Sequence, residues 1–281
     1  QKTAFLRAAQ KQLEEAGFTV DITCVAASIM KREAMHTYNL YAGDFNHAEI
    51  VFVTYYDTPL LQLFPRERKA FASNWTQGNF LLHTLLFLLC ILVIVFLLYS
   101  GVLPNLQRYG FMSIWGAVLV LVCLSGFYIV RQMRGGMAAG NTMVRNSSSL
   151  ITLFALASEL SEQEKEHVAF ALIDEGTRSE YGLKMLDAYL NGKSIKRVYL
   201  DAIGNTGRLQ CFSRDEISIS ADMEWHEKRK AMDPYGDILL TRGEFQNSAV
   251  ILRDDKNDQA IEHIMSTADA LHELIRQCFD V

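Results

Sequence analysis

Carboxylate side chains come directly after three of the strands that the sequence predicts. In a sheet of parallel strands, binding and catalytic sites form at the carboxyl ends of the strands. Carboxylates gathered there could hold a divalent metal ion or act as a general base. The candidate residues, in chain order, are Asp57, Asp174, Glu175 and Asp201.

The histidines do not add a metal-ligand motif. His263 and His272 lie nine residues apart on one predicted helix, which is about two and a half turns and too far for one shared metal ion. His83 lies in an apolar segment, where we expect it to face a partner helix or the membrane interface rather than to relay protons. The remaining histidines are His36, His47, His167 and His226.

Strands that alternate with helices predict an α/β fold that positions these side chains. The predicted strands cover residues 18–27, 38–42, 49–56, 168–173, 197–200, 209–212 and 249–252, and the predicted helices cover 5–16, 147–160, 181–190, 237–242 and 259–279. The run at 49–56 is almost continuously apolar, β-branched or aromatic, which is typical of a central strand covered on both faces. We therefore expect a three-layer α/β/α sandwich with a mostly parallel central sheet.

Two uncharged apolar runs interrupt this pattern. Residues 80–102 and 111–130 contain no Asp, Glu, Lys or Arg, and each is long enough to cross a bilayer core of about 30 Å as a helix. The break between them holds Pro104, Asn105 and Gly110, which predict a tight turn. Two buried core helices are the alternative, but such helices keep a polar stripe. We expect a transmembrane hairpin at 80–131, inserted into one α/β domain made of 1–79 and 132–281.

Flanking charges predict which side of the membrane holds the domain. Five basic residues lie on the domain side of the hairpin, whereas the turn carries only Arg108. Positive charge is retained in the cytoplasm, so we expect an integral membrane protein with a cytoplasmic domain. The five are Arg66, Arg68, Lys69, Arg131 and Arg134.

Other features of the chain exclude some classes of function. The five cysteines form no pairing pattern, which fits a reducing compartment. The net charge of −5 gives no footprint for nucleic acid, and there is no Gly-rich phosphate loop. The chain begins at Gln1 without methionine, so we expect that an upstream segment has been removed.

Five segments carry a further pattern when they are taken in order. They are Ile-Val-Phe-Val-Thr-Tyr-Tyr-Asp-Thr at 50–58, Arg-Asn-Ser-Ser-Ser-Leu at 145–150, Phe-Ala-Leu-Ile-Asp-Glu-Gly-Thr at 170–177, Val-Tyr-Leu-Asp-Ala-Ile-Gly at 198–204, and 236–252. Together they resemble the zinc aminopeptidase family. That family includes leucyl-type aminopeptidases and glutaminyl cyclases, together with non-catalytic relatives such as nicalin, nicastrin and the transferrin receptor ectodomain.

The resemblance implies a two-zinc site, which needs His and carboxylate ligands and a general-base Glu. Most of those positions are replaced in this chain. Tyr55 stands for the first His ligand, Arg145 for the bridging Asp, Gly176 and Thr177 for the Glu pair, and Asp254 for the last His. Only Asp201, a ligand position, and Asp57, which would orient the lost His, remain. We expect Arg145 to substitute its own charge for bound metal and to pair with Asp57 or Asp201.

A shifted alignment offers an alternative. Moving the Glu pair two residues earlier, onto Asp174 and Glu175, would restore a general base and one ligand, with Asp57 and Asp201 as further zinc ligands. This alignment needs a gap, still lacks a His ligand and still contains Arg145. We therefore expect neither a catalytic residue nor a cofactor, and zinc only if the alternative holds.

The resemblance and the hairpin together suggest three functions. The first is a membrane-anchored pseudopeptidase that acts as a scaffold or assembly subunit for other integral membrane proteins. The second is a divergent membrane metallo-aminopeptidase or cyclase. The third is a sensor that binds a peptide or protein terminus without cleaving it. Because the hairpin is inserted between Asp57 and Ser147, we also expect the pocket to face the bilayer surface, where it could grip a loop or terminus of a membrane protein. The alternative is that the hairpin only anchors the domain and that the pocket is vestigial.

Overall fold

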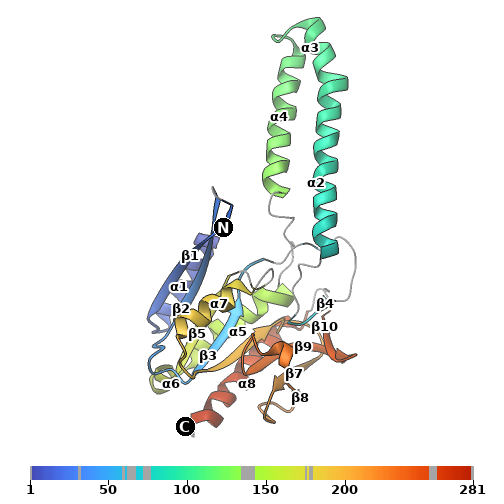
Figure 1. Ribbon diagram of the computed structural model, residues 1–281. Coiled ribbons are helices and arrows are strands. Elements are labelled where there is room, and N and C mark those ends of the chain that lie inside the picture. The colour runs from blue at the N-terminus through green and yellow to red at the C-terminus, as the bar shows by residue number, and fades with distance from the viewer. Residues whose placement is uncertain are drawn as a thin grey trace. The chain divides into compact units, whose positions relative to one another are not determined.

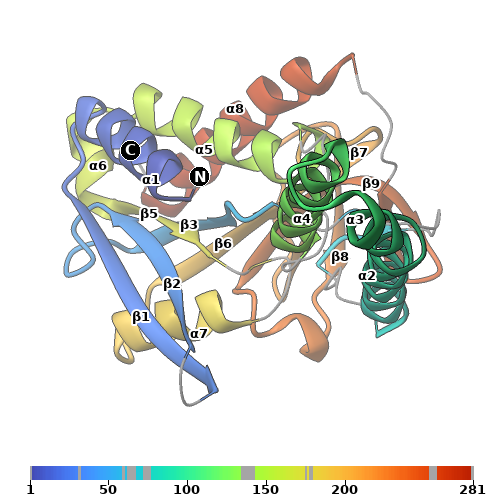
Figure 2. The same cartoon turned by 90° about the horizontal axis from the view of Figure 1, so that it is seen from above.

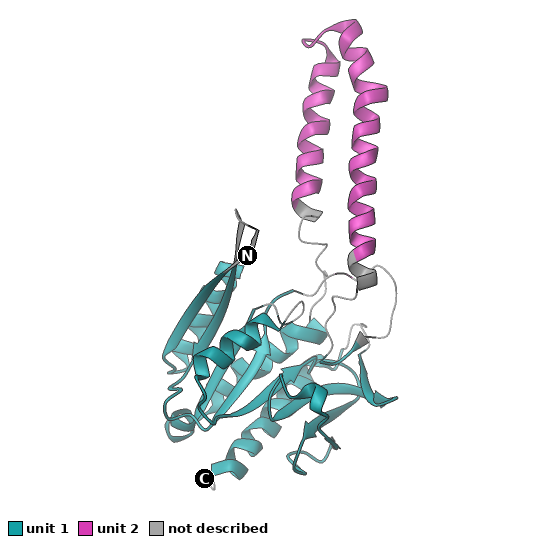
Figure 3. Ribbon diagram, viewed as in Figure 1, with its two compact units in different colours: residues 1–59, 66–74, 141–281 teal, residues 60–65, 75–140 magenta. Residues whose placement is uncertain are grey.

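The chain divides into two compact units (Figure 3). The first comprises residues 1–59, 66–74 and 141–281, and the second comprises 60–65 and 75–140. The structure, a computed structural model, describes residues 2–30, 33–58, 61, 68–71, 77–133, 143–174, 176, 180–252 and 258–279. Arg66 and Arg134, which belong to the predicted charge bias, lie outside these residues.

A ten-stranded sheet forms the centre of the first unit (Figure 1). Its strand order is β1-β2-β5-β3-β6-β9-β10-β4, with β7 beside β9 and β8 beside β7. The four central strands, β5 (Val168–Ile173), β3 (Ile50–Tyr55), β6 (Lys196–Asp201) and β9 (Ile238–Gln246), run parallel. The outer strands are β1 (Val20–Met30), β2 (Glu33–Ala42), β4 (Arg68–Lys69), β7 (Arg208–Ser213), β8 (Met223–Glu227) and β10 (Ala249–Leu252).

Helices cover both faces of this sheet, as Figure 2 shows. On one face, α1 (Lys2–Glu15), α5 (Ser148–Glu159) and α8 (Ala260–Phe279) contribute apolar side chains to one core. On the other face, α7 (Tyr181–Leu190) contributes Leu183, Leu186 and Leu190 to a second core. The short helix α6 (Glu162–His167) begins with a capping box between Ser161 and Glu164. The expected α/β sandwich with a mostly parallel central sheet is confirmed.

One predicted helix in this unit is wrong. Residues 238–242 of the predicted helix 237–242 belong to strand β9, which pairs in parallel with β6. Ile238, Leu239 and Leu240 are all buried, because both faces of a central strand are covered. A short apolar run of this kind cannot be assigned to strand or helix by periodicity alone.

The second unit contains two long apolar helices. The first rod comprises α2 (Gln77–Leu97), the π-helical turn η1 (Leu98–Val102) and α3 (Leu103–Tyr109), and the second is α4 (Ile114–Met133). Stretches of 29 residues (Leu81–Tyr109) and 18 residues (Ile114–Arg131) are apolar and long enough to cross a membrane. Gly126 of α4 lies against Ile94 of α2, since a Cβ atom on Gly126 would be in ordinary van der Waals contact with Ile94 Cδ1 at 3.5 Å.

The predicted turn at 103–110 is also wrong. Residues 103–109 continue the helix as α3, with Pro104 directly after the π-helical turn η1. A proline inside a helix lacks one backbone hydrogen bond, and irregular turns such as η1 accompany such positions. The chain reverses only after Gly110, whose φ of 79° suits a glycine. The turn therefore lies at 110–113, and the first helical rod is longer than expected.

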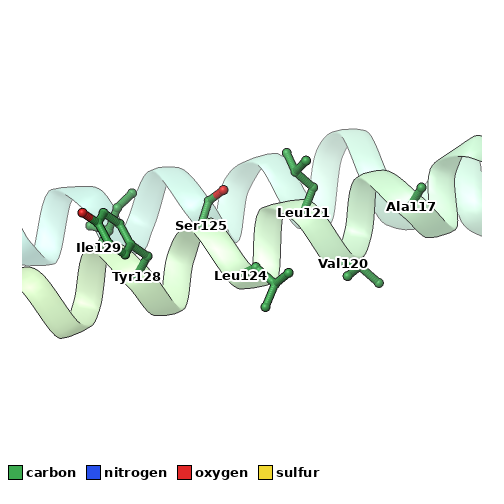
Figure 4. Close-up of a pocket in the computed structure, with 7 residues that line it drawn as sticks. All are labelled: Ala117, Val120, Leu121, Leu124, Ser125, Tyr128 and Ile129. Atoms are coloured by element: carbon green, nitrogen blue, oxygen red, sulfur yellow. The ribbon is translucent and has the colours of Figure 1, made fainter.

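A shallow groove runs along α4 on the surface of the second unit (Figure 4). Its lining residues all come from α4 and are Ala117, Val120, Leu121, Leu124, Ser125, Tyr128 and Ile129. The side chains of Leu121, Leu124 and Tyr128 are exposed. Such a face suits contact with lipid tails or with another transmembrane helix.

Candidate functional site

A chain of three polar side chains lies at the carboxyl ends of β3 and β6. Tyr55 ends β3 and Asp201 ends β6, and these strands are parallel neighbours. The Tyr55 hydroxyl donates a 2.5 Å hydrogen bond to Asp201 Oδ1 and accepts a 2.8 Å bond from Arg145 Nε. Arg145 also forms an ion pair with Asp201, at 3.7 Å from Nε to Oδ1. The expected pairing of Arg145 with Asp201 is confirmed.

The backbone that carries Arg145 is part of this arrangement. Arg145 lies in the π-helical turn η2 (Met143–Ser147), directly before α5. Ser148 and Ser149 donate hydrogen bonds from their hydroxyl groups to the Arg145 carbonyl. The Asn146 side chain donates to the Asp57 carbonyl at 3.0 Å. These bonds hold the turn against the end of β3, so that the guanidinium group points at Tyr55.

The second carboxylate oxygen of Asp201 also has a protein partner. The backbone N–H of Phe71 donates to Asp201 Oδ2 at 2.9 Å. Phe71 has a φ of 55°, and its carbonyl accepts a 2.8 Å bond from the Tyr235 hydroxyl. Its ring packs edge-on against Tyr199 and Phe212. Sequence reasoning missed Phe71, because a backbone donor leaves no signature in the residue type.

Burial and charge together fix the protonation of this site. Burial raises the pKa of the Tyr55 hydroxyl well above 10, although the positive charge of Arg145 opposes the effect. Burial acts to lower the pKa of Arg145, but the neighbouring Tyr55 and Asp201 outweigh it and raise that pKa overall. Tyr55 is therefore a neutral donor and Arg145 a cation at neutral pH. A neutral phenol with a raised pKa is a poor metal ligand.

Gly176 leaves no room for the carboxylate that the resemblance would place there. A Cβ atom on Gly176 would overlap the Tyr55 side chain at Cβ and would also lie 2.8 Å from Cγ. Contacts below 3.0 Å force something to shift. Tyr55 thus occupies the space beside Gly176, the position to which the resemblance assigns a general base. Glu175, Thr177 and Asp254 lie outside the described residues.

Asp174 belongs to a different set of contacts. Its carboxylate is fully buried and pairs with Lys2 Nζ at 2.7 Å. It also accepts a 3.3 Å bond from the Tyr38 backbone N–H, and its own N–H donates to Asn39 Oδ1. These bonds tie the end of β5 to α1 and β2. Asp57 is buried at 4% exposure and lies next to the site through the Asn146 bond.

Each histidine contacts a different partner. His263 Nδ1 bonds to the Asn205 carbonyl, and His272 Nε2 pairs with Glu164, so the two do not meet. The other contacts are His36 with Cys24, His47 with Asp44, His83 with the Leu61 carbonyl, His167 with Glu49, and His226 with Gln210. None of these contacts joins a histidine to Asp201.

The described residues do not fit a zinc centre. Among them, no group of three or more His, Cys, Asp or Glu side chains is arranged to hold a metal ion. Both oxygens of Asp201 already accept bonds from the protein. Arg145 brings a positive charge to 3.7 Å from Asp201, where it would repel a dication. The site is organised around an internal ion pair.

Comparison with known proteins gives a likeness in structure. No protein-family profile matches the sequence, and no curated protein sequence matches it. A Zn-dependent exopeptidase from Parabacteroides distasonis is similar in structure, with a TM-score of 0.55 and 8% identity over 98% of this chain and 89% of that chain. A leucine aminopeptidase precursor from Bacteroides thetaiotaomicron gives 0.54 and 10% identity over 98% and 88%.

A third solved structure, the glutaminyl cyclase of Bacteroides thetaiotaomicron bound to N-acetylhistamine, gives a TM-score of 0.54 and 10% identity over 98% of this chain and 89% of that chain. At such low identity the likeness establishes the fold alone, and any chemistry has to be argued from the residues of the site. The chain therefore has the fold of the zinc-dependent exopeptidases and glutaminyl cyclases, as the sequence motifs predicted.

Proposed function

We propose that this chain is a membrane-anchored, non-catalytic aminopeptidase-like subunit that acts as a scaffold or assembly factor in a membrane protein complex. One observation carries the proposal. It is the buried Arg145–Tyr55–Asp201 chain of contacts at the carboxyl ends of β3 and β6, at positions to which the resemblance in sequence assigns metal ligands. In this proposal the fold is kept, but an ion pair within the protein stands in place of the metal ligands. Such a change suits a protein that acts by binding other proteins through its surface.

The two other functions fit the described residues less well. A divergent metallo-aminopeptidase would need Asp174 as a base or ligand, but that carboxylate is buried and paired with Lys2. A peptide sensor would need a site that is open to a terminus. Arg145 and Asp201 are only 6% and 2% exposed and are paired with each other.

The membrane placement is part of the proposal. The two apolar helices would cross the bilayer, and the excess of positive charge beside the first unit would keep that unit in the cytoplasm. The α4 groove would then offer a face to a transmembrane helix of a partner protein, with Ala117 and Ser125 permitting close approach.

Metal analysis tests the central claim. The full chain, purified in detergent and incubated with Zn²⁺, is expected to retain less than about a tenth of an equivalent of zinc per chain by elemental mass spectrometry. A variant carrying Tyr55→His together with Arg145→Asp supplies a histidine and a carboxylate beside Asp201 and is expected to retain more. One or two equivalents in the unmodified chain, with peptidase or cyclase turnover, would contradict the proposal and restore Asp174, Glu175 and Asp201 as candidates.

Isolation of the native assembly tests the scaffold role. Tagged chain expressed at its native level and extracted in a mild detergent is expected to carry other integral membrane proteins in fixed ratio. Ser125→Leu adds bulk to the exposed α4 groove and is expected to release them, whereas Leu92→Phe on the exposed face of α2 is the matched control. Recovery of the chain without any membrane partner would count against the scaffold role.

Thiol labelling tests the orientation. Met112 is fully exposed in the turn between α3 and α4, so Met112→Cys is expected to react with an impermeant maleimide in intact cells. Cys24, which is exposed in the first unit, is expected to react only after lysis. The reverse pattern would place the first unit outside.

A further inference from the structure

A cysteine, a histidine and a tyrosine gather on one face of the β1–β2 hairpin. Cys24 lies on β1 and His36 on β2, and their side chains are in contact, with Cys24 Sγ 3.6 Å from His36 Nδ1. The register accounts for this contact, because Cys24 pairs with Tyr38 and His36 is two residues from Tyr38 along β2. Side chains two residues apart on a strand point to the same face of a sheet. Cys24 and His36 are both exposed, so the thiol is open to a small reagent.

Tyr38 gives the same thiol a second partner. Its side chain hydrogen-bonds to Cys24, and this bond is the largest cause of a raised pKa at the Tyr38 hydroxyl group. The hydroxyl group therefore keeps its proton at neutral pH and can donate a hydrogen bond to an ionised sulfur. Backbone bonds hold Tyr38 in place, because its N–H donates to Asp174 Oδ2 and its carbonyl accepts from the Tyr56 hydroxyl group. The position of this donor is thus fixed by the fold.

The charged groups that face this cluster from neighbouring elements are Lys2 of α1 and Asp174 at the end of β5. They form an ion pair with each other at 2.7 Å. Asp174 raises the pKa of Tyr38 and Lys2 lowers it, so the two charges act on the cluster in opposite directions. His36 is the neighbouring group that is placed to accept the proton of Cys24, since its Nδ1 is an acceptor when the ring carries its hydrogen on Nε2. A cysteine beside such a base has the arrangement of an activated thiol.

In the described part of the chain, the other four cysteines do not combine exposure to water with a neighbouring base. Cys211 is buried, and burial raises the pKa of its thiol to about 12. Cys90 and Cys123 lie on the apolar helices α2 and α4. Cys278 is half-buried, and Lys196 Nζ lies 3.8 Å from its sulfur. A lysine at neutral pH already carries its proton and cannot accept that of a thiol. Cys24 is therefore the thiol with both access and a proton acceptor.

We propose that Cys24 is a site of reversible modification by small disulfides, such as glutathione disulfide, and that His36 is the base that removes the thiol proton. This proposal is independent of the proposed function. The reaction is thiol–disulfide exchange, in which the Cys24 sulfur attacks one sulfur of the small disulfide. A new S–S bond to Cys24 forms as the old S–S bond breaks, and the departing thiolate takes the proton that His36 received. Cys24 is oxidised and half of the small disulfide is reduced to a free thiol, so no other oxidant is needed.

Site-resolved kinetics test the proposal. The full chain is reduced in detergent, freed of reductant and incubated with glutathione disulfide at pH 7, and the mixed disulfide at each cysteine is measured over time by peptide mass spectrometry. Cys24 is expected to react about tenfold faster than Cys278, because a base lies within reach of its thiol. An excess of reduced glutathione is expected to restore the free thiol. Equal rates at Cys24 and Cys278 would overturn the proposal.

Substitution of the base separates activation of the thiol from its exposure. His36→Asn is expected to slow the reaction at Cys24 about tenfold at pH 7, while an unchanged rate at Cys278 in the same sample shows that the variant is folded. His47→Asn is the matched control, because His47 is also an exposed histidine of the first unit but pairs with Asp44, and it is expected to change neither rate.

The pH dependence gives a second readout, which a purely structural role of His36 would not move. In His36→Asn the rate at Cys24 is expected to rise with the ionisation of an ordinary thiol, near about pH 8.5, whereas in the unmodified chain the rise is expected at lower pH. A rate at Cys24 that His36→Asn leaves unchanged, or the same pH profile in both chains, would overturn the proposal.

Discussion

The hydroxyl group of Tyr55 lies between two opposite charges, 2.5 Å from Asp201 Oδ1 and 2.8 Å from Arg145 Nε. It accepts from the guanidinium group and donates to the carboxylate, so it transmits polarisation from one charge to the other. The direct separation of the charged groups is 3.7 Å. Tyr55 is therefore a structural part of the ion pair.

Removal of that hydroxyl group is expected to destabilise the first unit. Tyr55→Phe deletes one donor and one acceptor while keeping the ring, and hydrogen bonds to charged groups contribute about 1.5–3 kcal/mol each. The thermal unfolding midpoint in detergent should fall. Tyr99→Phe is the control, because Tyr99 is 77% exposed. An unchanged midpoint for Tyr55→Phe would mean that the hydroxyl group between Arg145 and Asp201 does not contribute to stability.

Loss of the charge on Arg145 is expected to cost more than loss of the bridge. Arg145→Met leaves Asp201 buried without its cation, and breaking a buried pair in this way costs about 3–5 kcal/mol. Asp201→Asn in the same chain should recover part of the loss, because it removes the orphaned charge. A double-mutant cycle of unfolding free energies gives the coupling. Additive effects would show that the two groups do not interact.

The sequence predicted the central sheet because its strands carry strong local signals. The runs that became β3 and β5 are almost entirely apolar and are buried at every position, which is typical of central parallel strands that are covered on both faces. The run that became β9 carries the same signal in a shorter form and was assigned to a helix. The full length of β1 and β2 was also missed, because the described side chains in the middle of this hairpin, Cys24, Val25, Ala26 and His36, are exposed and give no buried pattern.

The candidate site was predictable in its residue types and less so in its contacts. The resemblance in sequence assigned Tyr55, Arg145 and Asp201 to ligand positions of one metal site. Because β3 and β6 are parallel neighbours, their carboxyl ends bring Tyr55 and Asp201 together. The bond from Phe71 could not be foreseen, because it depends on a backbone with positive φ. The pairing of Asp174 with Lys2 joins residues 172 positions apart, and no local pattern encodes such a contact.

High pH is expected to destabilise the first unit through its buried tyrosines. Burial raises the pKa of Tyr41 to about 12 and that of Tyr55 well above 10, whereas an unfolded tyrosine titrates near 10. Below pH 10 both states keep the proton, so stability does not change. Above it the unfolded chain releases protons that the folded chain retains, and stability falls by up to about 1.4 kcal/mol per pH unit for each tyrosine.

The slope of stability against pH isolates one of these groups. Tyr41→Phe should make the decline between about pH 10 and 12 shallower by one proton. At pH 8, the change in unfolding free energy of Tyr41→Phe reports separately the loss of the hydrogen bond that Asn39 Nδ2 donates to the Tyr41 hydroxyl group. Chemical unfolding followed at several pH values gives both quantities. An unchanged slope would mean that Tyr41 ionises equally in the folded and unfolded chains.

Gly126 is expected to control the packing of the two apolar helices. It is buried, and a Cβ atom at this position would meet Ile94 at 3.5 Å for Cδ1 and 3.6 Å for Cγ2. A methyl group would be in ordinary contact, but the longer side chain of Gly126→Leu would push α4 away from α2. In lipid or detergent the association of helices depends on such close packing rather than on burial from water.

Ser125→Leu provides the matched comparison for Gly126. Ser125 is the preceding residue and is exposed on α4, so the same leucine there leaves the contact between the helices intact. Gly126→Leu should lower the temperature at which the detergent-solubilised chain aggregates, and Ser125→Leu should leave that temperature unchanged. Gly126→Ala should have a small effect, because the space at Ile94 admits one methyl group. Equal losses for the two leucine variants would show that the helices are not packed through Gly126.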